Sequence, residues 1–387
     1  MSDSVAVVWD DSLLGYTMGG DHPLHPVRLD LTMRLADSLG VLATDRVELL
    51  RPTPADVDLL TLVHDPAYLE AVRRAPEDLT MRLEQRYGLG SGDNPVFPRM
   101  HEAAALVTGA SVEAARAVWE GGSEHAVNIA GGLHHALRDR ASGFCVYDDP
   151  AVAIAWLLQA GATRVAYVDV DVHHGDGVQA AFYGDPRVLT VSLHESGHYL
   201  FPGTGFATET GTGDGRGYSV NVALPPDTSD AEWLRAFDAV VPPVLRAYRP
   251  EVLVTQLGCD THTLDPLAHL ALSVDGQRAA YALLHDLAHE LCGGRWVVLG
   301  GGGYEIVQVV PRSWTYALAE VCGARLPDAI PEDWQHEAFA RSGEHGPTRM
   351  SDGRTVAWEP WDGGSAGHVD RAIAATVGAS FPLLGVG

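Results

Sequence analysis

Residues 165–177 read V-A-Y-V-D-V-D-V-H-H-G-D-G, and their apolar, β-branched start predicts a buried strand of a parallel sheet. Acidic side chains are rare inside such a strand unless a partner neutralises them. Because Asp169, Asp171 and His173 alternate, we expect their side chains to leave one face of the extended chain together. The Gly-Asp-Gly turn then brings Asp176 back towards them. The stretch predicts a metal half-site that needs a further ligand, the alternative being a capped turn with a solvated cluster.

Strands and helices alternate along most of the chain, which predicts an α/β fold with βαβ units in a single parallel sheet. The strand-like segments are 4–9, 126–130, 164–171, 188–194, 218–224, 252–257 and 296–299. The helix-like segments are 27–39, 100–120, 150–159, 230–248 and 275–291. With 387 residues and 46% hydrophobic content, the chain can bury a large core as one large domain or two. We expect a catalytic domain over residues 1–325 and an extension over residues 326–387 that is packed on the domain or partly disordered.

The charge of the chain excludes several classes of function. A net charge of −25 is a poor match to nucleic acid or to an anionic membrane surface, and it favours cationic partners. All 26 basic residues are arginine, so a P-loop lysine and a Schiff-base lysine are both excluded.

The four cysteines form no C-x-x-C pair, and the N-terminus does not resemble an export signal. We therefore expect reduced thiols and a cytoplasmic protein, with no membrane-spanning segment.

Four predicted strand ends carry residues that can do chemistry. They are G-L-H-H ending at 135, D-V-D-V-H at 169–173, G-C-D at 258–260 and G-G-G-G-Y at 300–304. In open α/β sheets the site lies beyond the carboxyl ends of the strands, so these four segments are expected to meet. Asp260 then supplies the missing ligand beside Asp171 and His173, and open positions remain for water and substrate. Zinc is the default ion for this set, and Fe(II) is a competitor because two of the ligands are carboxylates.

The remaining residues at these ends suit acid–base chemistry. His134 and His135 titrate near neutral pH and can transfer protons. Asp169 and Asp176 are the available acceptors that would orient the two imidazoles. Tyr304, which follows four glycines, is a candidate donor to a developing oxyanion; the alternative is a core tyrosine with a satisfied hydroxyl group.

Six motifs in this order resemble those of the histone deacetylase superfamily, and residues 260–273 look most like its bacterial acetoin utilization proteins. The motifs are A-G-G-L-H-H-A at 130–136, G-F-C at 143–145, D-V-D-V-H-H-G-D-G at 169–177, F-P-G-T-G at 201–205, L-G-C-D at 257–260 and G-G-G-Y at 301–304. The resemblance spans roughly residues 20 to 325. It implies an arginase/deacetylase fold with a parallel sheet of about eight strands flanked by helices. It also implies hydrolysis of an N-acetyl amide, typically on lysine.

The resemblance further assigns roles to individual positions. It implies that Asp171, His173 and Asp260 bind the metal ion. His134 and His135 match the acid–base pair, and Asp169 and Asp176 match the carboxylates behind these two histidines. Tyr304 matches the tyrosine that polarises the carbonyl group. The implied substrate residues are Asp93 at the rim, Gly143 and Phe144, Phe201 and Leu267. Asp169, Ser192 and Leu193 match a structural K⁺ or Na⁺ site, and Arg28 matches the arginine of an acetate channel. One departure is that Val146 and Asp148 stand where the family often has tyrosine and asparagine.

The leading function is therefore a zinc-dependent lysine deacetylase that acts on acetylated proteins or peptides, with no direct role for nucleic acid. Deacetylation of a small amine such as an acetylpolyamine is the second candidate. Leu267 separates these two functions, because polyamine-type relatives carry an acidic residue at that position. An arginase-like site with two manganese ions needs more bridging aspartates than this sequence offers. A non-catalytic metal-binding regulatory protein is the remaining alternative.

Overall fold

Eight parallel strands form one sheet in the computed structural model of the chain, which describes residues 4–77, 84–90 and 92–386. Their order across the sheet is β2-β1-β3-β8-β7-β4-β5-β6, and every neighbouring pair is parallel. The strands are β1 (Val5–Val8), β2 (Val47–Leu50), β3 (His125–Asn128), β4 (Val165–Asp169), β5 (Val188–Glu195), β6 (Ser219–Leu224), β7 (Val252–Gln256) and β8 (Trp296–Leu299). The expected α/β fold with a parallel sheet of about eight strands is confirmed.

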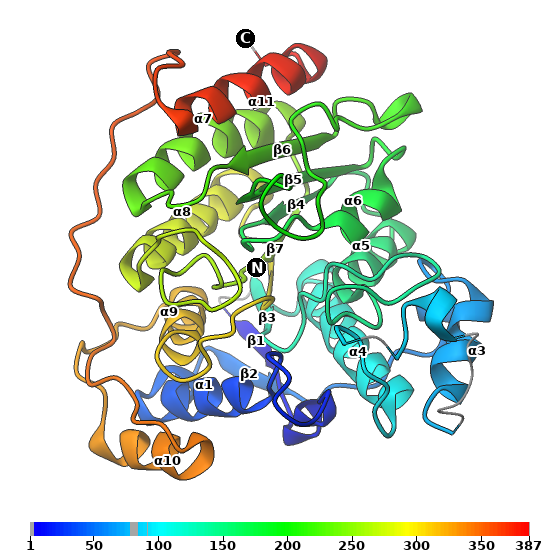
Figure 1. The fold of residues 1–387 in the computed structure, drawn as a ribbon, viewed down its shortest axis with the longest axis vertical. Coiled ribbons are helices and arrows are strands. Elements are labelled where there is room, and N and C mark those ends of the chain that lie inside the picture. The colour runs from blue at the N-terminus through cyan, green and yellow to red at the C-terminus, as the bar shows by residue number, and fades with distance from the viewer. Residues whose placement is uncertain (1–3, 78–83, 91, 387) are drawn as a thin grey trace.

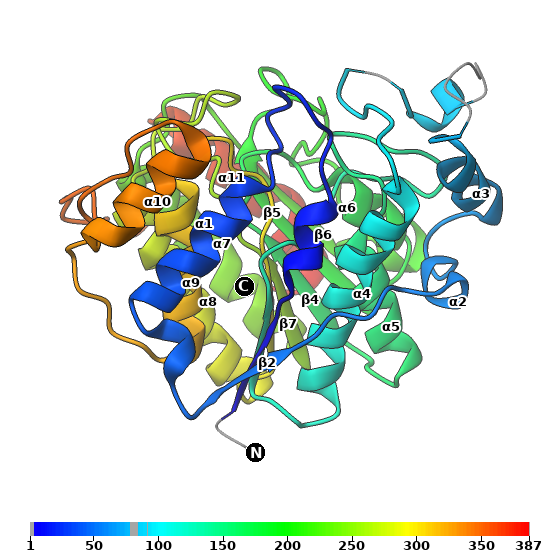
Figure 2. The same cartoon turned by 90° about the horizontal axis from the view of Figure 1, so that it is seen from below.

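Helices cover both faces of this sheet (Figures 1 and 2). On one face lie α4 (Met100–Trp119), α5 (Asp149–Gln159) and α6 (Asp176–Phe182), with α2 (Val57–Leu60) and α3 (Pro66–Arg74) outside them. On the other lie α1 (Val27–Ser38), α7 (Asp230–Tyr248), α8 (Val274–Cys292) and α9 (Val310–Cys322). Strands β3, β4, β7 and β8 are buried along their whole length, which explains why their apolar residues follow one another instead of alternating with exposed polar residues.

The sequence-based prediction departs most from the structure at two strands, and the other strand ends differ by no more than two residues. β2 was not predicted, and it pairs only with β1 at the edge of the sheet, where its side chains are partly exposed and its apolar signal is weak. The central strand was predicted to reach residue 171, but β4 ends at Asp169. Beyond it, the side chain of Asp169 accepts a hydrogen bond from the backbone of Asp171 at 3.1 Å, and Asp171 does the same for His173 at 3.0 Å. These local bonds take the place of ladder bonds at Asp171 and His173, while the backbone of Val170 still donates to the carbonyl oxygen of Gln256 at 3.1 Å.

Residues after 325 include two helices, α10 (Glu332–Ser342) and α11 (His368–Leu384). α10 packs on α1, where Trp334 donates a hydrogen bond to the carbonyl oxygen of Leu31 at 3.0 Å. α11 packs on α7 and on β6 at the far end of the sheet, and a long connection between α10 and α11 runs over the outside (Figure 1). The domain boundary at 325 stays a prediction. No helix in the described part of the chain has the length and apolarity needed to cross a bilayer.

Candidate active site and metal centre

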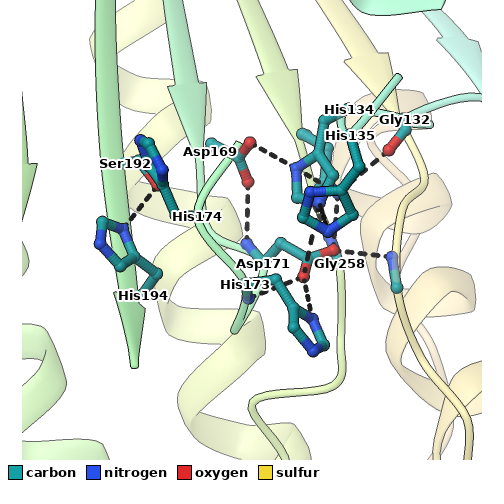
Figure 3. Close-up of polar contacts among 12 residues, drawn as sticks. Gly132, His134, His135, Asp169, Asp171, His173, His174, Ser192, His194 and Gly258 are labelled. Atoms are coloured by element: carbon teal, nitrogen blue, oxygen red, sulfur yellow. Dashed lines mark hydrogen bonds and ion pairs between the residues drawn. The ribbon is translucent and has the colours of Figure 1, made fainter. Parts of the chain in front are cut away.

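The four predicted strand ends meet at one edge of the sheet, because β3, β8, β7 and β4 are consecutive neighbours. His173 lies at their centre and contacts two buried carboxylates through the same Nδ1 atom. Asp171 lies 3.1 Å from this nitrogen on one side and Asp260 lies 3.1 Å from it on the other. The three residues offer ligand atoms that all lie within 4.8 Å of one another. Chain segments about ninety residues apart thus bring the three expected ligands together, and Figure 3 shows two of them, Asp171 and His173.

The charges in this set are compatible with a bound cation. Asp171 and Asp260 are fully buried, and burial together with the negative charge of Asp171 raises the pKa of Asp260 to about 8. Burial alone would lower the pKa of His173, but hydrogen bonds to the two carboxylates outweigh it and raise that pKa to about 10. Without an ion, a proton on Asp260 and the charge on His173 neutralise this set, and a divalent ion would take the place of both. Their oxygens and the imidazole nitrogen are ligands that Zn²⁺ and Fe²⁺ both accept, so the residues present fit a divalent ion.

The histidine pair stands beside this set, with Asp169 next to His134 (Figure 3), and each member of the pair has a carboxylate of its own. The Nδ1 atom of His134 lies 2.7 Å from Asp169, and that of His135 lies 2.7 Å from Asp176. The two Nε2 atoms lie 3.0 Å apart. Burial opposes a charge on His134, but the charges of Asp169 and Asp171 outweigh it and raise its pKa to about 9. Burial and the neighbouring His134 lower the pKa of His135 to about 4, so the pair can hold one proton near neutral pH.

Tyr304 faces the same pocket from the glycine-rich turn after β8. Its backbone N–H donates to Asp265 at 2.8 Å, which fixes the turn, and its ring contacts Phe144 and His173 edge to face. A Cβ atom on Gly302 would collide with Asp260, so glycine is required where the turn passes the ligand set. Burial raises the pKa of Tyr304 well above its usual range, so its hydroxyl group stays protonated and able to donate.

A pocket of about 210 Å³ leads from the surface to these residues. Its lining includes every predicted substrate residue, and the full set is Asp93, His135, Gly143, Phe144, His173, Leu200, Phe201, Leu267 and Tyr304. Asp93 is exposed at the rim, and Phe201 is 43% exposed. Gly143 has a φ of 50°, and a Cβ atom there would collide with His135 and narrow the pocket. The pocket is therefore narrow, largely apolar, and closed at its inner end by polar groups.

The remaining predicted site residues, Arg28, Ser192 and Leu193, are buried near the ligand set. The buried Arg28 donates to the carbonyl oxygens of Gly301 and Gly303 at 2.8 and 3.0 Å, and its guanidinium stacks over Trp314. Ser192 and Leu193 are buried in β5, with Ser192 in register opposite Asp169. The hydroxyl group of Ser192 contacts Nδ1 of His194 at 2.8 Å (Figure 3).

Several neighbours of the site were not predicted. Gln256, at the end of β7, donates to Asp171 at 2.6 Å and to the carbonyl oxygen of Gly132 at 3.2 Å. Tyr167 donates to Asp169 at 2.7 Å. A polar glutamine in the run V-L-V-T-Q was the available signal for the first of these, whereas nothing in the sequence marks Leu200 as pocket lining.

At the departure from the family pattern, Asp148 is fully buried and caps α5 by accepting from the backbone of Ala151 at 2.8 Å. Burial raises its pKa well above the usual range. Aspartate at this position therefore supplies a side-chain oxygen that caps the start of the helix.

The sequence and the fold both match known proteins. The model of the histone deacetylase domain matches residues 22–321. The chain is 43% identical over 335 residues to the acetoin utilization protein AcuC of Bacillus subtilis, which covers 86% of each chain. It is 36% identical over 336 residues to AcuC of Staphylococcus xylosus, which covers 86% of this chain and 87% of that protein.

Among solved structures, an HDAC homolog complexed with SAHA superposes with a TM-score of 0.84 at 31% identity, and an HDAC homolog from Aquifex aeolicus superposes with a TM-score of 0.83 at 30% identity. Both matches cover 96% of this chain and all of the other, so they extend into the residues after 325.

Proposed function

The chain belongs to the histone deacetylase family, and from that premise we propose that it is a metal-dependent amidohydrolase that removes acetyl groups from N-ε-acetyl-lysine in proteins or peptides. One observation carries the proposal. The narrow pocket has aromatic and aliphatic walls along its length, and its inner end joins the imidazole of His135, the His173 ligand set and the hydroxyl-bearing ring of Tyr304. An extended, neutral acyl-lysine side chain matches the walls, and its amide group matches the inner end.

Asp171, His173 and Asp260 would hold the ion, with Zn²⁺ as the first expectation and Fe²⁺ as the second. When bound, a divalent ion supplies Lewis acidity, which polarises a carbonyl group and lowers the pKa of water. Gln256 orients Asp171 through the 2.6 Å hydrogen bond between them, which fixes the carboxylate without adding charge. We also assign Asp169, Ser192 and Leu193 to a structural K⁺ or Na⁺ ion beside this centre.

The histidine pair would move the protons of the reaction. It takes the proton of the attacking water at the Nε2 atoms, which lie on the sides of the rings away from Asp169 and Asp176. The proton that the pair already holds is delivered to the lysine nitrogen, which leaves as a neutral amine, so the pair again holds one proton at the end. Because each Nδ1 atom is held by its own carboxylate, the rings keep their orientation while the charge of the pair changes.

Tyr304 would donate its hydroxyl hydrogen to the acetyl oxygen as negative charge develops there. Its raised pKa keeps that hydrogen in place at neutral pH. Phe144, Phe201 and Leu267 would hold the lysine stem by apolar contact, and Asp93 at the rim would accept hydrogen bonds from the substrate backbone. Arg28, below the glycine turn, would attract the acetate product.

The apolar walls of the inner pocket support the proposed substrate class, since the carboxylate of Asp93 lies at the exposed rim. A polyamine carries further ammonium groups that need an anionic partner inside the pocket, and Leu267 offers none. The four cysteines are buried and free, which supports a reducing, cytoplasmic setting.

The direct test uses an acetyl-lysine peptide and measures the acetate released. The chelated protein should be inactive and should recover with added Zn²⁺ or Fe²⁺, whereas Asp260→Ala should stay inactive and lose the ion while its circular dichroism spectrum is unchanged. His336→Ala, which alters an exposed histidine on α10, is the control. Full activity in the chelated protein, or in Asp260→Ala, would contradict the proposal.

A further inference from the structure

A second group of histidines lies at the opposite edge of the sheet from the active site. His125 is the first residue of β3, at its amino end, whereas the active site follows the carboxyl ends of the strands. His285 and His289 lie one turn apart on one face of α8, so both reach towards His125. The Nε2 atom of His285 lies 3.1 Å from that of His125 and 2.9 Å from that of His289. The three imidazoles thus direct their Nε2 atoms at one point between the strand and the helix.

The partners on the other side of the rings determine which nitrogen carries hydrogen. The Nδ1 atom of His125 lies 2.8 Å from the carbonyl oxygen of Gly294, which can only accept a hydrogen bond. The Nδ1 atom of His285 lies 2.8 Å from the carboxylate of Glu320, which accepts when it is ionised. Both Nδ1 atoms therefore carry hydrogen. In the neutral imidazoles, the two facing Nε2 atoms then present lone pairs to each other at 3.1 Å.

Facing lone pairs repel each other unless a cation lies between them. For two imidazole nitrogens bound to one tetrahedral zinc ion at about 2.0–2.1 Å, the expected separation is about 3.3 Å. The observed separations of 3.1 and 2.9 Å are close to that value. Carboxylates also lie next to the outer Nδ1 atoms of two of the rings. Glu320 contacts that atom of His285, and Glu124 lies 3.6 Å from that of His289. Carboxylates on the outer nitrogen of ligating histidines are a general feature of zinc sites, because they fix the ring and raise its basicity.

We propose that His125, His285 and His289 bind a second divalent transition-metal ion, of which Zn²⁺ is the first candidate, through their Nε2 atoms. Such an ion joins the start of β3 to the last turns of α8, so its role is to stabilise the fold. His125 is 1% exposed, while the side chain of His289 is 44% exposed, so the open coordination position faces solvent on the side of the helix. The ring of His285 stacks on Trp296 with an interplanar angle of 17°, which holds the central ligand in place before an ion arrives. All three ligands are neutral imidazoles, and this set suits zinc, copper or nickel better than magnesium or calcium.

The alternative arrangement is a shared proton. If His285 carried hydrogen on both nitrogens, its Nε2–H group could point at His125 and His289 together, and no metal ion would be needed. The two arrangements differ in metal content, which can be measured directly on the full chain.

In the experiment, all metal is removed with a chelator, excess Zn²⁺ is added and the protein is desalted. The zinc content per chain is then measured by elemental mass spectrometry. The native chain should retain two ions, one at each site. His289→Ala should retain one, and His336→Ala, an exposed helical histidine outside both groups, should retain two. Because His289 is largely on the helix surface, its loss should leave the fold intact, which circular dichroism checks.

The same count in Asp260→Ala separates this site from the active site. That variant should retain one ion, and the double variant with His289→Ala should retain none. Added Zn²⁺ should raise the melting temperature of Asp260→Ala but not that of the double variant. His285→Ala provides a second variant with the same expected loss. A native chain that holds one ion lost on Asp260→Ala, or a His289→Ala protein with as much zinc as the native chain, would overturn the proposal.

Discussion

The Nε2 atoms of His134 and His135 lie 3.0 Å apart, although the Nδ1 atom of each ring is held at 2.7 Å by a different carboxylate. Adjacent residues in the sequence thereby acquire opposite pKa shifts. Burial would lower the pKa of both, but Asp169 and Asp171 overcome it at His134, whereas the neighbouring charge reinforces it at His135. A pair of this kind holds one proton over a wide range of pH, which is what a group that both takes and delivers a proton requires.

The first prediction concerns the alkaline side of the pH profile. Activity should fall as pH rises through the pKa of about 9 at His134, because the pair then loses the proton that it delivers to the amine. Asp169→Asn removes the anion that raises this pKa, so the alkaline limb of kcat/KM should move to lower pH. Asp176→Asn should move it less, since Asp176 contacts His135 directly. An alkaline limb in Asp169→Asn that matches the native enzyme would disprove this role for the pair.

Tyr304→Phe removes only a hydroxyl group, so substrate should still bind. Turnover should fall by roughly the 10²–10³ that a lost oxyanion donor costs. Steady-state kinetics with an acetyl-lysine peptide would measure kcat and KM separately. Tyr199→Phe, which changes an exposed tyrosine near the pocket, is the control. A rise in KM with normal kcat would mean that Tyr304 is only part of the pocket wall.

The third prediction concerns the selectivity of the pocket wall. Leu267→Glu places a carboxylate beside the path of the substrate, so the ratio of activity on acetylpolyamines to activity on acetyl-lysine should rise. Leu264→Glu adds the same charge to an exposed position three residues earlier in the same loop, and it should leave the ratio unchanged. Equal ratios in the two variants would show that long-range charge, and not this wall, controls the preference.

A stability prediction concerns the anchor of the residues after 325. Asp352 accepts hydrogen bonds from Arg312 at 2.7 Å and from the backbone of Val274 at 2.8 Å, and it contacts His262 at 2.9 Å. Burial opposes its ionisation, but these partners hold the pKa of Asp352 below its usual range. The resulting stability is present above the unfolded pKa of about 4 and is lost as pH falls towards the folded value.

Asp352→Asn should therefore lower the free energy of unfolding by about 2 kcal/mol at pH 7, as expected for hydrogen bonds to charged groups. The difference from the native protein should shrink below about pH 4, where the native carboxyl group also becomes protonated. Urea unfolding at pH 7 and pH 3 measures both values, with the exposed Asp362→Asn as the control. A difference that does not change with pH would mean that the charge of Asp352 contributes nothing.

Much of the sheet could be predicted from the sequence because its central strands are buried on both faces. β7 and β8 are short runs of apolar residues between turns, and such runs leave little choice of structure. β2 was missed because an edge strand needs no continuous apolar run. α10 and α11 were missed because their contacts with α1, α7 and β6 stabilise them, and those contacts are not visible in local periodicity.

The ligand set could be predicted because an acidic residue at the end of a buried strand is costly unless a cation or hydrogen-bond donors neutralise it. The predicted backbone at two of these ligands was wrong. Asp171 and His173 come together in a turn after the end of β4 and not along an extended strand. Gln256 was missed because a polar residue at a strand end gains meaning only once its neighbour, Asp171, is known. The group formed by His125, His285 and His289 was missed for the same reason, because β3 and α8 are far apart in the sequence.

The measurement that tests the assignment most directly compares two substrates on the zinc-reconstituted native enzyme. The kcat/KM value for an acetyl-lysine peptide should exceed that for an acetylated polyamine, because Phe144, Phe201 and Leu267 form apolar walls that suit a neutral stem. A native enzyme that prefers the acetylpolyamine, or that hydrolyses neither substrate while retaining its metal ion, would contradict the assignment as a lysine deacetylase.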